Sequence, residues 1–133
     1  MADRNLSLTV LDETLAVCRL AAEARPPDWA ARGRFWSMTR TAGELSLVCE
    51  QSLIPGDCDQ SIRIEPGWRA FEVAGPLDFG LTGILASLAQ PLARAGISIF
   101  SLSTFETDYL LVKETDLGRA VEVLRRAGHQ VAT

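Results

Sequence analysis

The stretch GISIFSLSTFETDYLLV, residues 96–112, predicts two β-strands joined by a polar corner. β-prone apolar residues dominate positions 97–102 before the corner and fill positions 109–112 after it. Every residue from 103 to 108 except Phe105 is polar, and none is glycine. A hairpin needs only a few turn residues, so the corner carries more hydroxyl and carboxylate groups than turning requires. This surplus suggests a ligand site, and the alternative is a solvated connection between edge strands.

Toward the N-terminus of this hairpin, the pattern predicts a strand and then a helix. The strand covers residues 68–74, and from Leu81 onward the apolar residues at 81, 84, 85, 88 and 92 define one helical face. Gly96 ends the helix, because the left-handed position after a C-cap prefers glycine. Pro91 lies inside the helix. It lacks an N–H and clashes with the carbonyl of Ser87, so it predicts a kink.

Toward the C-terminus, a second helix and a short last strand are predicted. Asp116 can cap this helix, its apolar residues share one face, and Gly128 ends it. Residues 130–131 are long enough only for a short strand. The order strand, helix, strand, strand, helix, strand is the ferredoxin-like βαββαβ pattern. We therefore expect an α+β fold, with a four-stranded antiparallel sheet and two helices on one of its faces.

The first half of the chain predicts more strand than helix. Apolar alternation favours a strand over residues 6–10, and residues 15–20 form a second β-like run. A glycine-containing connection joins residues 34–40 and 44–50 into a hairpin. Residues 26–34 begin with two prolines and can hold at most a turn or two of helix. The first half therefore lacks at least one of the helices that the second half carries.

The two predicted hairpins are similar in sequence. At an offset of 64 residues, 37–50 lies over 101–114 without a gap, which places Glu44 on Asp108. The gapless register and the shared carboxylate favour a duplication, and coincidence between two amphipathic hairpins is the alternative. The pattern leaves open whether Glu44 marks a second, pseudo-symmetric site.

A duplication implies two modules. Pro66-Gly67 is the best candidate boundary, which gives a degenerate module over residues 1–65 and a complete module over residues 66–133. A sheet face that lacks its helix is costly to leave in water. We therefore expect the halves to pack together, a second chain to cover the face as in a homodimer, or both.

The composition excludes several classes of function. With 47% hydrophobic residues among 133, the chain is expected to fold, and a net charge of −4 argues against a nucleic-acid surface. No apolar run approaches the ~20 residues of a transmembrane helix, so no membrane is expected as a partner. Cys18 and Cys49 lie in apolar runs as reduced core thiols do, and the N-terminus carries no secretory core. These features predict a cytoplasmic protein.

Two segments together carry a family resemblance. Residues 75–84 read GPLDFGLTGI, and they are followed by GISIF and STFETDYLLV within residues 96–112. With these motifs, residues 68–128 closely resemble small bacterial ACT-domain proteins related to the CASTOR-type arginine sensors, and residues 15–50 resemble them more loosely. The resemblance implies two tandem ACT-like modules and a regulatory protein that binds an amino acid, often at an interface between modules. It also implies that Asp108, at the corner between two strands, helps to hold the ligand.

The residues themselves are compatible with a zwitterion site. The glycines of the loop from Gly75 to Gly83 let backbone amides approach a ligand, and amides at a helix start suit a carboxylate. Asp108 suits an ammonium or guanidinium group. For Asp78 the alternative is a helix-entry residue, and for Thr82 and Ser103 it is ordinary surface polarity. The candidate ligand-binding residues are Gly75, Asp78, Thr82, Gly83, Ile84, Ser103, Thr104 and Asp108.

Two other functions compete with this one. A ligand-free dimerisation or protein-interaction module is supported by the missing helix cover and by three tryptophans, although tryptophan is also a common core residue. An enzyme has little support. His129, the only histidine, lies near a helix end, where a solvated or cap-interacting ring is expected. No phosphate loop, dinucleotide fingerprint or metal-type spacing is present, so no catalytic residue, metal or cofactor is predicted.

Overall fold

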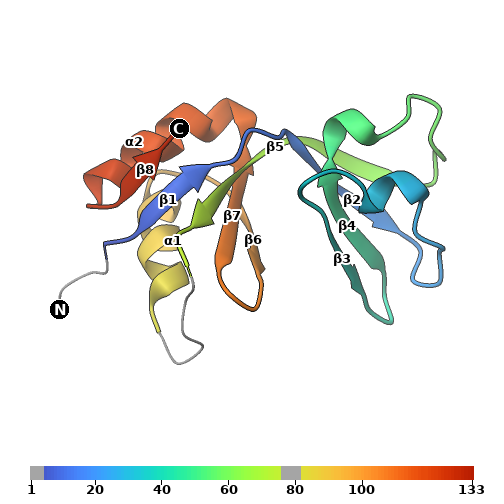
Figure 1. Ribbon diagram of the computed structural model, residues 1–133, viewed down its shortest axis with the longest axis horizontal. Coiled ribbons are helices and arrows are strands. Elements are labelled where there is room, and N and C mark those ends of the chain that lie inside the picture. Colours follow the sequence, from blue (N-terminus) through green and yellow to red (C-terminus); the bar gives the residue numbers. More distant parts are fainter. Residues whose placement is uncertain (1–4, 76–81) are drawn as a thin grey trace. The chain divides into compact units, whose positions relative to one another are not determined.

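The computed structural model describes residues 5–75 and 82–133, which form two compact units (Figure 1). The larger unit combines residues 1–12 with residues 69–133, and the smaller unit consists of residues 13–68. Within the described residues, no helix is long and apolar enough to cross a membrane.

The second half of the chain follows the predicted order of strands and helices. Its elements are β5 (Arg63–Val73), α1 (Ile84–Arg94), β6 (Ile99–Ser103), β7 (Asp108–Lys113), α2 (Leu117–Arg126) and β8 (Gln130–Ala132). This is the ferredoxin-like βαββαβ order, so the predicted fold class is confirmed.

The N-terminal strand β1 (Ser7–Val10) belongs to the larger unit, which the predicted division at residue 65 does not include. It lies between β5, with which it pairs antiparallel, and β8, with which it pairs parallel. The sheet of the larger unit therefore runs β6-β7-β5-β1-β8, so the predicted four-stranded antiparallel sheet is wrong by one inserted strand. The physical reason is burial, because Leu8 and Val10 enter the core of this unit.

Both helices of the larger unit contribute to one core. Alternate residues of the strands point to the same face of the sheet, and the apolar faces of α1 and α2 cover them. The buried residues of this core are Leu8, Val10, Phe71, Val73, Ile84, Leu88, Leu92, Ile97, Leu110, Val112, Ala120, Val121, Leu124 and Val131. Leu85 was predicted on the same helical face but is exposed.

The two helices end as the glycines predict, but α2 does not begin as expected. Gly96 and Gly128 have positive φ angles of 74° and 101°, and the residue after each donates back into its helix. The side chain of Asp116 makes no capping hydrogen bond. Its carboxylate instead accepts from Arg119 at 3.3 Å, and a 3-10 turn, η3 (Glu114–Asp116), leads into the helix.

His129 is buried at 4% exposure, whereas a solvated or cap-interacting ring was expected. Its Nδ1 accepts from the backbone N–H of Leu6 at 3.0 Å, so Nε2 carries the proton and donates to the carbonyl of Ser87 at 3.1 Å. That carbonyl lies four residues before Pro91, which has no N–H to give it. His129 therefore satisfies the acceptor that the proline leaves open, while the kink itself stays a prediction.

The smaller unit contains no α-helix in residues 13–68. Its elements are β2 (Leu15–Leu20), the 3-10 turn η1 (Asp28–Ala31), β3 (Ser37–Arg40), β4 (Leu45–Glu50) and the 3-10 turn η2 (Gln51–Leu53), with the first part of β5. The strands are ordered β3-β4-β2-β5. The predicted hairpin and the predicted loss of a helix are thus confirmed. Cys18 and Cys49 lie buried in this unit's core as free thiols, as expected.

Pro66-Gly67, the predicted boundary, forms a bulge inside β5. Leu15 pairs with Trp68 and Val17 pairs with Glu65, so one residue of β2 opposes two of β5. Pro is tolerated in a strand at such a site. Gly67 has a φ of 78°, and its N–H donates to the side chain of Gln51 at 2.7 Å. The strand therefore continues through the dipeptide.

Replacing Gly67 with alanine is expected to lower the free energy of unfolding by about 1 kcal/mol, because a Cβ disfavours the left-handed conformation. Apart from Gly67 and its two chain neighbours, no heavy atom of the described residues lies within 4 Å of where that Cβ would be, so the effect is one of backbone conformation. Gly56 has equally open surroundings without a positive φ, so Gly56→Ala is the matched control. Urea unfolding of both variants makes the comparison, and equal stability of the two would contradict the bulge assignment.

The register of the hairpins corrects the internal alignment. Arg40 pairs with Leu45, and Ser103 pairs with Asp108. The hairpins therefore correspond at an offset of 63 (103 − 40 and 108 − 45), not 64. The structural counterpart of Asp108 is Leu45, which is buried, and not Glu44. The shared carboxylate that suggested a second site at Glu44 is not reproduced by the fold.

Candidate functional site

The corner between β6 and β7 is a four-residue turn built by its own threonines. The backbone N–H and the hydroxyl of Thr104 both approach the carbonyl of Thr107, at 2.8 and 3.1 Å, and the Thr107 N–H returns to the Thr104 hydroxyl at 3.3 Å. Thr41 and Glu44 make the same backbone bond in the other hairpin, at 2.9 Å. Some of the polar groups of the corner therefore stabilise the turn itself.

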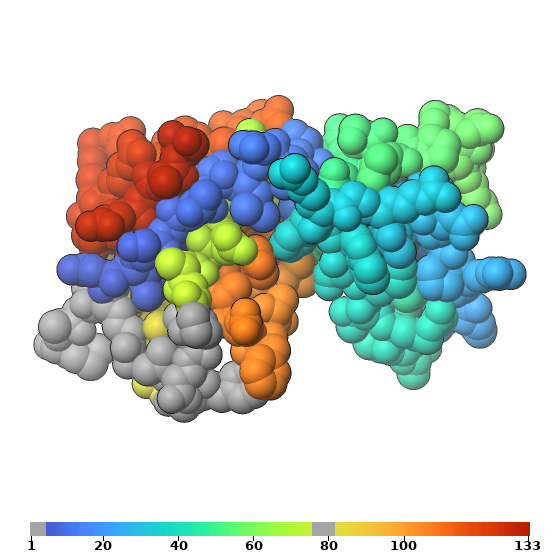
Figure 2. All heavy atoms as spheres, viewed as in Figure 1, coloured from blue at the N-terminus to red at the C-terminus, as the bar shows by residue number. Residues whose placement is uncertain are grey.

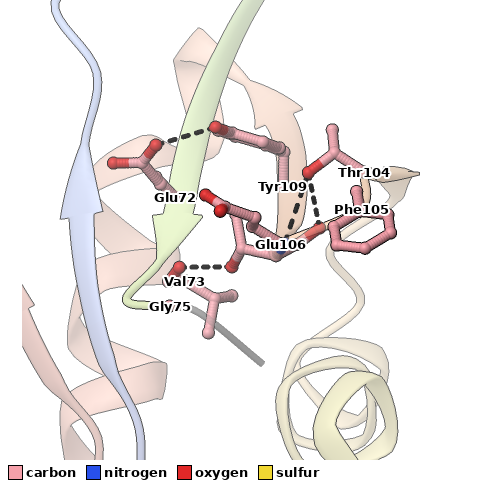
Figure 3. A pocket seen from close by; sticks show the side chains of 8 residues that line it. Glu72, Val73, Gly75, Thr104, Phe105, Glu106 and Tyr109 are labelled. Atoms are coloured by element: carbon pink, nitrogen blue, oxygen red, sulfur yellow. Dashed lines mark hydrogen bonds between the residues drawn. The ribbon is translucent and has the colours of Figure 1, made fainter. Parts of the chain in front are cut away.

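A buried hydroxyl ties this corner to the end of β5. Thr107 is 9% exposed, and its hydroxyl donates to the carbonyl of Val73 (Figure 3). β5 and β7 are neighbours in the sheet, so the bond fixes the corner against the point where the loop after β5 begins. Figure 2 shows the segment around the corner, in orange, at the surface of the larger unit.

A pocket of about 370 Å³ opens where these two segments meet. Small-molecule sites typically occupy about 300–1,000 Å³, so the pocket has the size of a site for a small ligand. Eight residues of three segments line it: Glu72, Val73, Gly75, Thr104, Phe105, Glu106, Thr107 and Tyr109.

The pocket has a negative electrostatic character. Its described lining includes two carboxylates, Glu72 and Glu106, and no lysine, arginine or histidine. The phenol of Tyr109 donates to Oε2 of Glu72 at 2.8 Å (Figure 3). Burial, this hydrogen bond, and the negative charges of Glu72 and Glu106 raise the pKa of Tyr109 to about 12. At neutral pH the phenol therefore keeps its proton and the pocket presents oxygen acceptors.

Tyr109 is the only tyrosine of the chain, so its titration can be read directly from the absorbance of the phenolate. We expect a midpoint near pH 12 in the folded protein. Because the folded pKa exceeds the ordinary value, the stabilisation is complete below about pH 10 and is lost as the pH rises through 12. Glu72→Gln should lower the midpoint, though not to 10, since burial remains. A midpoint unchanged by Glu72→Gln would contradict the assigned contact.

The structure brings together two of the eight predicted ligand-binding residues in this pocket, Gly75 and Thr104. Ser103 and Asp108 pair across the hairpin, the first exposed and the second half-buried. By strand alternation the Asp108 side chain points to the face that the helices cover, opposite to that of Tyr109.

The remaining predicted residues lie at or before the start of α1. Gly83 is the N-cap residue, with a φ of 79° and open space where a Cβ would lie, and Thr82 beside it is exposed. The Ile84 side chain belongs to the core. Asp78 lies outside the described residues.

Six of the eight lining residues are not among the predicted ligand-binding residues, and the two that matter most for the pocket's chemistry are Glu72 and Tyr109. Glu72 lies between the buried Phe71 and Val73 in β5. Because successive side chains of a strand point to opposite faces of the sheet, the sequence already indicated that the Glu72 carboxylate lies on the face opposite to the core. The partner was not apparent, because the hydrogen bond joins residues 37 positions apart. Among the residues that the structure describes, no group of three or more His, Cys, Asp or Glu side chains is arranged to hold a metal ion.

Comparison with known families gives two matches along the chain. The sequence profile of the ACT domain matches residues 63–126, and a profile of an N-terminal domain matches residues 13–57. The human protein named cytosolic arginine sensor for mTORC1 subunit 1 is 35% identical over 103 residues, which cover 74% of this chain and 31% of that protein. Its bovine counterpart is 36% identical over 112 residues. The chain thus spans about a third of the length of these curated relatives.

Solved structures show the same architecture over nearly the whole chain. A crystal structure of a protein from Agrobacterium tumefaciens is 41% identical, with a TM-score of 0.87, and the match covers 96% of this chain and 92% of that one. The regulatory subunit of aspartate kinase from Thermus flavus has a TM-score of 0.60 at 11% identity, covering 96% and 99% of the two chains. The second likeness concerns the fold alone.

Proposed function

This chain belongs to the ACT-domain family and is related to the cytosolic arginine sensors, and on that premise we propose that it is a non-catalytic regulatory protein that binds a free amino acid or similar small zwitterion. The larger unit, which contains most of the matched ACT segment, is the part that binds it. The relatives support this assignment, because their name describes amino-acid sensing.

One observation carries the proposal: the pocket of about 370 Å³ between the end of β5 and the corner of β6 and β7. It joins the start of the glycine-containing loop, at Gly75, to the polar corner, at Thr104. The sequence motifs point to these same two segments. A regulatory ligand held there would contact both Gly75, just after β5, and the corner of the hairpin.

The start of α1 offers a place for the ligand's carboxylate. Gly83 has no side chain to obstruct the approach, and among the described residues none caps α1 with its side chain, so the first amides of the helix can donate to an anion. Asp108 does not line the pocket: its side chain lies on the helix-covered face of the same corner, and there it supplies a carboxylate for a cationic group of a ligand that reaches from the pocket past the corner. We include Thr82 and Ser103, which are next to these groups in the chain, and keep Asp78 in the proposal on the sequence motif alone.

A thermal-shift screen of the common amino acids tests the function. At about a hundred times its dissociation constant, a ligand should stabilise the protein by ~2.7 kcal/mol, which is a rise of several degrees for a chain of this size. Asp108→Ala should remove the shift and leave the melting temperature of the unliganded protein nearly unchanged. A large drop in the unliganded protein would make Asp108 structural. No shift with any amino acid would favour the alternative, a ligand-free dimerisation or interaction module.

We also propose that the protein is a homodimer in the cytoplasm. Light scattering gives the mass in solution, and measuring it with and without the ligand shows whether binding and assembly are linked. A monomer under both conditions would remove the dimer from the proposal and leave the binding function to the screen.

A further inference from the structure

We propose that Cys18 and Cys49 are a redox-active pair, which hydrogen peroxide converts reversibly into a disulfide within the chain. Both residues belong to the core of the smaller unit, whereas the residues that line the pocket belong to the larger unit. The inference therefore does not depend on the proposed amino-acid binding. It follows from the strand register, the burial and the chemistry of the two thiols.

The register of β2 and β4 brings the two cysteine side chains to the same face of the sheet. The strands are antiparallel neighbours (Figure 1), with Ala16 opposite Cys49 and Cys18 opposite Leu47. Residues directly opposite each other share a face of the sheet, and so do residues two positions apart in one strand. Cys18 and Cys49 are therefore diagonal neighbours on one face, and both enter the same apolar cluster.

Each thiol is a hydrogen-bond partner of the other inside this cluster. Cys18 is 1% exposed and Cys49 is 0% exposed, and their side chains hydrogen-bond to each other. A small oxidant such as hydrogen peroxide reaches them when the smaller unit opens locally. Once one sulfur is oxidised, the other thiol is already beside it, while the surrounding apolar side chains exclude water. The burial of the pair therefore favours a bond between the two sulfurs over further oxidation.

The hydrogen bond also makes the two thiols unequal. It lowers the pKa of Cys18 below the ordinary value of a thiol, against the opposing effect of burial. The same bond, burial and the negative charges of Cys18 and Glu50 raise the pKa of Cys49. Because the thiolate is the form that oxidants attack, Cys18 is the thiol that reacts first and Cys49 is the one that keeps its proton.

The reaction takes place in two steps. The Cys18 thiolate attacks one oxygen of the peroxide, the O–O bond breaks, and Cys18 becomes a sulfenic acid while hydroxide leaves. The Cys49 sulfur then attacks the sulfur of Cys18, the S–O bond breaks, and the departing hydroxide takes the Cys49 proton to form water. The first hydroxide takes up the proton that Cys18 released on ionising. Two thiols and one peroxide thus give one disulfide and two waters.

The bond requires a small movement of the strands. Diagonal neighbours on antiparallel strands typically have Cα atoms about 7–8 Å apart, and a disulfide typically spans about 4.4–6.8 Å. β2 and β4 must therefore approach each other by roughly 1 Å at this point. A disulfide that forms against such a displacement is more easily reduced, so the modification is reversible.

Peroxide treatment of the folded full chain tests the pair in a Cys58→Ser variant. Cys58, the third free cysteine, is half-buried outside the strands, and its removal leaves only the proposed pair. We expect this variant to lose both thiols and the mass of two hydrogen atoms, and to regain both thiols with dithiothreitol. On a denaturing, non-reducing gel it should remain a single chain. Trypsin should release residues 5–19 joined to residues 41–63.

The wild-type chain is the matched control, because its half-buried Cys58 shows that the peroxide has acted on the protein. If peroxide oxidises Cys58 in the wild type but leaves both thiols free in the Cys58→Ser variant, the inference is overturned. A disulfide between two chains, or separate sulfinic acids on Cys18 and Cys49, would overturn it as well. These readouts require no change in the core, so they do not depend on whether a core variant folds.

Two further variants, made in the Cys58→Ser background, test which thiol attacks. Cys49→Ala should leave Cys18 as a sulfenic acid that dimedone labels, because no second thiol is present to resolve it. Cys18→Ala should leave Cys49 unlabelled under the same conditions, since its thiol keeps its proton. Circular dichroism confirms that each variant is folded. Stronger labelling of Cys49 than of Cys18 would overturn the assignment of Cys18 as the attacking thiol.

Discussion

His129→Ala should lower the free energy of unfolding by about 3 kcal/mol and the melting temperature by about 10 °C. The ring is buried and supplies both an acceptor to the N–H of Leu6 and a donor to the carbonyl of Ser87. Alanine leaves both backbone groups without that partner and opens a cavity beside α1. Calorimetry of the variant measures the change. A decrease of less than about 1 kcal/mol in the free energy of unfolding would contradict this account, because it would show that water replaces the two hydrogen bonds of the ring at little cost.

Pro91→Ala provides the control for the hydrogen bond from His129 to the carbonyl of Ser87. Alanine supplies an N–H four residues after Ser87, which can satisfy the carbonyl that the proline leaves open. The double variant Pro91→Ala/His129→Ala should therefore lose about 1 kcal/mol less than the sum of the single changes. Strict additivity would contradict the pairing of the proline with the histidine.

Gly33→Ala is expected to destabilise the smaller unit by about 3 kcal/mol. Gly33 has a φ of 83°, which alanine adopts poorly, and a Cβ there would overlap the carboxylate of Glu50. That carboxylate accepts from the backbone N–H groups of Arg34 and Phe35, the second at 3.2 Å. The added methyl group therefore strains the backbone and displaces an acceptor at the same time.

Gly43→Ala is the matched control for this change. Gly43 lies in the hairpin turn of the same unit and has no positive φ, and the atom nearest to an added Cβ, the Thr41 hydroxyl oxygen, would be 3.9 Å away. Hydrogen exchange should show faster opening of residues 13–68 in Gly33→Ala and little change in Gly43→Ala. Equal protection in the two variants would mean that the contact with Glu50 contributes little to this unit.

Local sequence signals predicted most of the elements and failed where pairing is long-range. The helices and the two hairpins follow from periodicity, and the positions of Gly96 and Gly128 fixed where the helices end. The alternation over residues 6–10 correctly indicated a strand with one buried face. This alternation does not indicate which strands pair with residues 6–10, however, so the insertion of β1 between β5 and β8 was not predicted.

The candidate functional site was likewise predicted only in part. The corner was identified from its composition, and Thr104 does line a pocket with Gly75. The turn itself also accounts for some of the polar residues of the corner, because Thr104 and Thr107 form hydrogen bonds with each other. Glu72 was missed, since its significance depends on the phenol of Tyr109 on a neighbouring strand. A pocket formed by strand neighbours requires the sheet order, and a single sequence does not specify that order.

The most direct test of amino-acid binding by the larger unit is a ¹⁵N NMR titration with the amino acid that gives the largest thermal shift. We expect amide shifts to concentrate at the end of β5, residues 72–75, at the corner, residues 103–109, and at the start of α1, residues 83–86, with one ligand bound per chain. Shifts confined to residues 13–68, or none in any of these segments at saturating ligand, would contradict binding by the larger unit.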